Sequence, residues 1–61
     1  MACRDFLVLQ SAQQESVWKA AAQEAGRPAV ASGAGLMNGV SACQDKPNMS
    51  VLDVAKAVSP Y

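Results

Sequence analysis

The stretch from residue 5 to residue 25 most constrains the fold, because it lies in the longest part of the chain without glycine or proline. Asp5 can cap a helix, and Gly26 followed by Pro28 would end it. Apolar residues in the second half recur at the helical spacing i, i+3, i+4 and i+7. These residues are Trp18, Ala21, Ala22 and Ala25. Polar residues occupy the remaining face, so the pattern predicts an amphipathic helix over residues 12 to 25.

The beginning of this stretch has two interpretations. Residues 6 to 9 form a continuous apolar run, which is typical of a buried strand as well as of a helix. Ser11 followed by Gln14 is a capping-box pattern that would start a shorter helix at residue 12. The sequence therefore predicts either one helix over residues 5 to 25, or a strand over residues 6 to 9 followed by a helix over residues 12 to 25.

Residues 27 to 48 have a different composition. Alanine, glycine and serine dominate, and no charged residue occurs between Arg27 and Asp45. The pair Asn38 and Gly39 is a tight-turn signal, because both residue types tolerate positive φ. We therefore predict an irregular loop here, with a few apolar residues that pack onto the first helix.

Small residues recur every fourth position within this predicted loop. They are Ala31, Gly35, Gly39 and Cys43. A Gly-x-x-x-Gly pair lets membrane helices approach closely, and the uncharged window is near the lower length limit for a membrane span. The window also holds several polar residues, which make insertion unfavourable. A loop remains the favoured interpretation, with close packing against a partner helix as the alternative.

A short helix is predicted over residues 50 to 58. Ser50 is an N-cap, Asp53 completes a capping box, and Met49 can pack against Val54 as a hydrophobic staple. A second apolar stripe at helical spacing follows the cap. It consists of Val51, Val54, Ala55 and Val58. A helix of this length is unstable alone, so its stripe must pack on the first helix or on another protein.

These elements predict a mainly α fold in one small domain over residues 1 to 61, with a helix, an irregular loop and a short helix. A chain of 61 residues builds only a small core, so we expect it to need a staple or a protein partner. Another protein, or a second copy of the chain, would bind the large apolar residues of the two helices. The expected partner-binding residues are Phe6, Leu7, Leu9, Trp18, Val51, Val54 and Val58.

Two cysteines, Cys3 and Cys43, permit one intramolecular disulfide. The amino-terminal residues contain only four consecutive apolar side chains, too few for the apolar region of a secretory signal. We therefore expect an intracellular protein, cytoplasmic or organellar, with two reduced thiols. The disulfide is the alternative.

The composition argues against an enzyme. The chain has no histidine, which removes the commonest general base and metal ligand. Two thiols fall short of the four ligands of a structural zinc site, and the serines have no base to activate them. We therefore predict no catalytic residue, no cofactor and no metal. A formal charge of zero gives no electrostatic footprint for nucleic acid or for an anionic membrane surface, so we expect neither as a partner.

Three functions follow in order of preference. The first is a non-enzymatic structural or protein-binding subunit that packs through amphipathic helices onto a larger assembly. The second is a free-standing small effector or inhibitor stapled by a disulfide between Cys3 and Cys43. The third is a small membrane-associated subunit.

Overall fold

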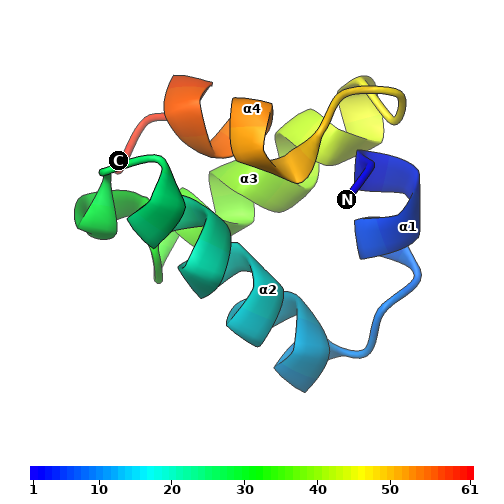
Figure 1. Cartoon of the computed structure of the whole chain (residues 1–61), viewed down its shortest axis with the longest axis horizontal. Helices are drawn as coiled ribbons and strands as arrows, with labels where there is room; N and C mark the ends of the chain where they lie inside the picture. Colours follow the sequence, from blue (N-terminus) through cyan, green and yellow to red (C-terminus); the bar gives the residue numbers. More distant parts are fainter.

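Four short α-helices and one turn of 3₁₀-helix make up most of the chain (Figure 1). The computed structural model describes all residues from 1 to 61. The elements are α1 (Cys3–Leu7), α2 (Ser11–Glu24), the 3₁₀-helix η1 (Pro28–Val30), α3 (Ala34–Asp45) and α4 (Val51–Ala57). The only β pairing is an isolated bridge between Ala2 and Ser50. The predicted mainly α class is confirmed, whereas the architecture has four helices rather than two.

The chain breaks between α1 and α2, so neither interpretation of residues 5 to 25 is correct as a whole. Phe6 lies in a helix rather than a strand, and that helix ends at Leu7. Asp5 lies inside α1 instead of capping it. The second helix begins at Ser11, close to the predicted residue 12. Its extended cap residue is Gln10, whose backbone N–H donates to the side chain of Gln13 at 3.4 Å, one position earlier than the predicted capping box.

The predicted irregular loop over residues 27 to 48 is wrong in its central part, because α3 occupies residues 34 to 45. Gly33, with φ of 60°, precedes the helix, and Asn38 and Gly39 lie inside it instead of forming a turn. Composition alone disfavours a helix here, since glycine in a helix interior costs about 1 kcal/mol relative to alanine. Tertiary packing overrides this preference.

The packing that favours glycine is a close approach along one face of α3. A Cβ atom on Gly39 would lie 2.6 Å from Cζ2 of Trp18, and one on Gly35 would lie 2.6 Å from the carbonyl carbon of Val30. Cys43 continues the same face and is completely buried. The four-residue spacing of small side chains therefore marks a face that packs inside the chain, rather than a membrane or partner-helix surface.

Replacing Gly35 by alanine should lower the free energy of unfolding by about 1–3 kcal/mol, the usual cost of overpacking. The added methyl group would meet the backbone of Val30, which cannot move aside as a flexible side chain would. In an exposed helix the same change would stabilise by about 1 kcal/mol, so the expected sign is reversed. Denaturant unfolding measures the difference. Ser41→Ala, at an exposed position of α3, is the control and should change stability little. A stabilised Gly35→Ala variant would contradict the close approach.

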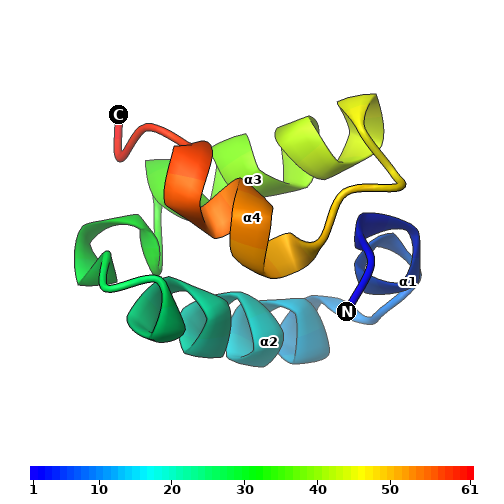
Figure 2. The ribbon, with the colours of Figure 1, turned by 45° about the horizontal axis from the view of Figure 1, so that its top comes forward.

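The core lies between α2, α3 and α4 (Figure 2). Trp18, Ala21 and Ala22 of the predicted first stripe are buried, and Ala25 is half-buried. The second stripe, from Val51 to Val58, is buried throughout. It packs against α2 and α3, so the apolar stripe of α4 is covered by the chain itself. Ser50 caps this helix by accepting a hydrogen bond from the backbone N–H of Asp53 at 3.1 Å.

The amino-terminal residues are held by the segment that joins α3 to α4. The backbone N–H of Cys3 donates to the carbonyl of Met49 at 2.8 Å, and the N–H of Val51 donates to the carbonyl of Met1 at 2.9 Å. A disulfide between Cys3 and Cys43 then joins α1 to α3. The expectation of two reduced thiols is therefore wrong, and the alternative disulfide is the one found.

Candidate functional site

Most of the residues expected to bind a partner are enclosed by the chain itself. Five of them have exposed fractions between 0% and 8%. These five are Phe6, Trp18, Val51, Val54 and Val58. Leu7 and Leu9 are half-buried at the edge of the core. The structure thus shows these five side chains covered by the chain itself, because α3 supplies a cover that a loop over the same residues would not have given.

Trp18 shows how complete this enclosure is. Its indole N–H donates a hydrogen bond to the backbone carbonyl of Val30, so the polar end of the ring has a partner inside the protein. The ring centroid lies 6.2 Å from that of Phe6, and the far edge of the ring rests on Gly39. No buried side-chain nitrogen or oxygen in the chain lacks a hydrogen-bond partner. Trp18 is thus a core anchor rather than an exposed binding residue.

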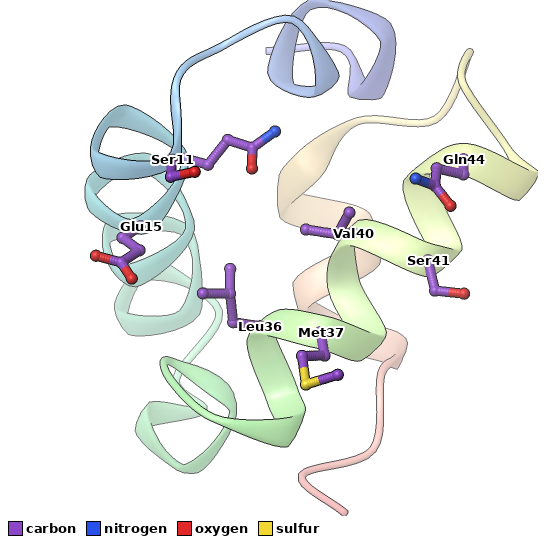
Figure 3. A pocket seen from close by; sticks show the side chains of 8 residues that line it. Ser11, Glu15, Leu36, Met37, Val40, Ser41 and Gln44 are labelled. Atoms are coloured by element: carbon purple, nitrogen blue, oxygen red, sulfur yellow. The ribbon is translucent and has the colours of Figure 1, made fainter.

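The largest hollow on the surface is a groove between α2 and α3, with a volume of 390 Å³. We call it the α2–α3 groove. Its lining residues are Ser11, Gln14 and Glu15 from α2, and Leu36, Met37, Val40, Ser41 and Gln44 from α3. Figure 3 shows Leu36 and Val40 pointing from α3 toward α2 across this groove. The groove therefore has an apolar wall on α3 and a polar wall on α2.

The apolar wall arises from the way α3 is seated in the fold. Gly35 and Gly39 turn inward, so their neighbours Leu36 and Val40 fall at the border between core and surface and are half-buried. Met37 follows Leu36 and is 73% exposed, one of the few large apolar side chains that the chain leaves in water. Together the three residues Leu36, Met37 and Val40 form a contiguous apolar strip, which we call the α3 strip.

The polar wall carries one charge. Glu15 is exposed and is the only ionisable residue that lines the groove. The other polar groups of the groove are the Ser11 hydroxyl and the Gln14 amide on α2, and the Ser41 hydroxyl and the Gln44 amide on α3, beside the α3 strip. Such a set can hold an apolar group against the α3 strip and accept a hydrogen bond or a positive charge at the rim. It contains no nucleophile paired with a base, and the chain has no group of three side chains suited to hold a metal ion.

Two smaller hollows flank α4, with volumes of 240 and 180 Å³. The larger of them is lined mainly by apolar residues around Met1, Val17 and Leu52, and the smaller by residues between the end of α3 and α4. Neither has a buried polar side chain directed into it, since the buried residues of this chain are all apolar or glycine. The α2–α3 groove is therefore the stronger candidate.

The sequence interpretation missed the α3 strip as a site because it placed these residues in a loop. The signal that could have found it is the spacing of Leu36, Met37 and Val40 at i, i+1 and i+4, beside small residues every fourth position. Both patterns are helical and belong to adjacent faces of one helix. Read together, they predict a helix with one close-packed face and one apolar face left over.

Comparisons with known proteins identify no relative of this chain. None of the four helices combines the length and the apolar character that a bilayer-spanning helix requires. No protein-family model, curated protein or solved structure matches the chain.

Proposed function

We propose that this chain is a free-standing, non-enzymatic effector that binds another protein by receiving an amphipathic helical segment in the α2–α3 groove. The observation that carries the proposal is the α3 strip, in which Met37 stays 73% exposed although the core of the chain is closed. An exposed apolar strip beside a groove is a common feature of protein-binding surfaces. The proposal keeps the predicted role in protein binding and moves it to a different set of residues.

The shape of the groove supports a helical occupant. Two helices form its walls, and an amphipathic helix can lay its apolar face into a groove of this kind through residues at i, i+3, i+4 and i+7. Met37 suits such an interface, because its unbranched side chain adapts to partners of different shape. Glu15 at the rim favours a partner whose polar face carries lysine or arginine.

The independence of the chain is supported by its closed core and by the disulfide. Eleven apolar residues are buried together without a partner, and Cys3–Cys43 closes most of the chain into one loop. Such a disulfide persists in an oxidising environment. Of the two predicted locations, the disulfide therefore favours an organelle over the cytoplasm. It also favours the stapled effector over a subunit that folds only on an assembly.

Binding can be tested with a synthetic helical peptide of leucine and lysine, in which the leucines form one face. On titration, NMR signals of Leu36, Met37 and Val40 should shift together. Met37→Gln should weaken binding about threefold to tenfold, equivalent to roughly 0.7–1.4 kcal/mol, because the variant buries less apolar surface. Val8→Gln is the matched control, since Val8 is 82% exposed and lies outside the groove. Equal losses for both variants, or shifts confined to other surfaces, would refute the proposal.

The acidic rim gives a second prediction with a different readout. Glu15→Gln removes the only charge of the groove lining while keeping the size of the side chain. Affinity for the lysine-containing peptide should fall by about twofold to fivefold at low salt, the range of an exposed ion pair. The difference should shrink at high salt because the interaction is screened. Isothermal titration at two salt concentrations measures it, and a loss that is independent of salt would mean that Glu15 does not act through its charge.

A further inference from the structure

The two walls of the α2–α3 groove are linked at one end by α1. Figure 3 shows α1 above the groove, between the start of α2 and the far part of α3. The direct contact between α2 and α3 is small, whereas α1 packs more extensively along α3. At this end the separation of the walls therefore depends on α1 and on what holds it.

The link from α1 to α3 is covalent. Cys3 in α1 is bonded to Cys43, which precedes the groove residue Gln44 and lies about one turn after Val40. Both cysteines are 0% exposed. The disulfide therefore attaches α1 to the same turn of α3 that forms this end of the groove.

The link from α1 to α2 is made by Gln14, which also lines the groove. Its side-chain amide donates to the carbonyl of Phe6 at 3.1 Å and to that of Leu7 at 3.5 Å, at the carboxyl end of α1. Phe6 adds apolar contact with Trp18 of α2. Gln14 and the disulfide are thus the two ends of one bridge between the groove walls.

We propose that the redox state of Cys3–Cys43 controls the α2–α3 groove: the disulfide holds it in its binding shape, and reduction lets the walls separate. The inference rests on the proposed function of the groove as a binding site. The reductant that we propose for this disulfide is a dithiol. One of its sulfurs attacks a cysteine sulfur, breaks the S–S bond and forms a mixed disulfide, and its second sulfur then attacks the first and releases the cysteine as a thiolate. The dithiol is oxidised to a cyclic disulfide, and the protein gains two electrons and two protons as two thiols.

Under conditions that stabilise the folded state, reduction should loosen this end of the molecule before the rest of the chain unfolds. Backbone hydrogen bonds from Cys3 and Arg4 to the carbonyls of Met49 and Pro47, at 2.8 and 3.0 Å, do not involve the sulfur atoms. They keep α1 near the segment between α3 and α4. Because both sulfurs are buried, the dithiol can attack only when α1 moves away, so reduction should be much slower in the folded chain than in denaturant.

The groove itself can be observed by NMR without a partner. Proton contacts between groove residues of α2 and those of α3 are recorded for the oxidised chain and for the chain reduced by dithiothreitol, at low temperature with sucrose to favour the folded state. We expect contacts between the α2 and α3 walls to weaken on reduction, while contacts between α2 and α4 remain. Unchanged groove contacts would overturn the inference. Complete unfolding under these conditions would also overturn it, because there would then be no folded reduced state in which the groove could change.

Two glutamine variants test the other end of the bridge while the disulfide stays intact. Gln14→Ala removes the hydrogen bonds to α1 and should weaken the same contacts between the walls. Gln44→Ala is the matched control, because Gln44 lines the same groove and makes no side-chain hydrogen bond to α1. Equal effects of the two variants would contradict the proposal that Gln14 links the groove walls through α1.

The leucine–lysine peptide separates this inference from the proposed function. We expect it to bind the oxidised chain at least about tenfold more tightly than the reduced chain, within the usual range of coupling between sites. If wall contacts change on reduction while the peptide binds neither form, the proposed function fails and redox control of the groove stands. If the peptide binds both forms equally at the groove, the proposed function stands and the redox inference fails.

Discussion

Replacing Cys3 and Cys43 by alanine is expected to lower the free energy of unfolding by about 4 kcal/mol, as the chain-entropy model gives for a loop of this length. The two cysteines are 40 residues apart, so the bond restricts most of the unfolded chain. Small domains have little stability to lose, at roughly 0.05–0.15 kcal/mol per residue. The doubly substituted chain should therefore be close to half unfolded at elevated temperature. Denaturant titration followed by far-UV circular dichroism measures the loss.

The single variants provide the control for this prediction. Cys3→Ala and Cys43→Ala each break the same bond, so each should cost nearly as much as the double variant. Independent sites would instead give additive losses. Alanine keeps the positions apolar, which limits the change in packing where both cysteines are completely buried. A double variant that loses less than about 1 kcal/mol, well below the usual range for a native disulfide, would contradict the stapling role of the bond.

The predictable parts of this fold are those specified locally. The helix containing Trp18 and the helix after Ser50 each have an apolar stripe at helical spacing and a terminal signal within a few residues. Gly26, with φ of 72°, follows α2 where the sequence predicts a stop. Such signals need no knowledge of the rest of the chain, because cap and stripe act within one helix.

The parts that could not be predicted depend on contacts between distant residues. Nothing in residues 8 to 10 breaks a helix by composition; the break lets α1 turn so that Cys3 reaches Cys43. Likewise, α3 contains two glycines that disfavour a helix until Val30 and Trp18 occupy the space beside them. Intrinsic helix propensity predicts neither the break after α1 nor the helix α3, since tertiary packing routinely overrides propensity.

The sequence does not separate core residues from candidate binding residues, for a related reason. A large apolar residue on an amphipathic helix gives the same pattern whether its cover comes from the same chain or from a partner. Trp18 and the valines of α4 are covered by the chain, whereas Met37 is left exposed. Deciding between these outcomes requires the position of α3, which the composition of residues 34 to 45 conceals.

Trp18→Ala should be among the most damaging single substitutions, with an expected loss of about 3–5 kcal/mol from the cavity and the lost burial. The side chain is completely buried and touches both Phe6 and Gly39. Its indole N–H also donates a hydrogen bond to the carbonyl of Val30. The substitution would leave this buried carbonyl without a partner, which adds to the cost. Trp18→Phe is the control, because it keeps most of the apolar volume and removes the N–H donor. Unfolding should be followed by circular dichroism, since Trp18 is the only tryptophan.

The interaction of the Trp18 ring with Gly39 can be isolated by a double-mutant cycle. Gly39→Ala should destabilise the native chain, because a Cβ at that position lies within 2.7 Å of Cζ3 of Trp18. In the Trp18→Ala background the space is empty, and the same change should be neutral or stabilising by up to about 1 kcal/mol, the difference in helix propensity. Sucrose would keep both backgrounds folded during the measurement. If Gly39→Ala costs the same with and without the ring, another contact fixes the approach of α3 to α2.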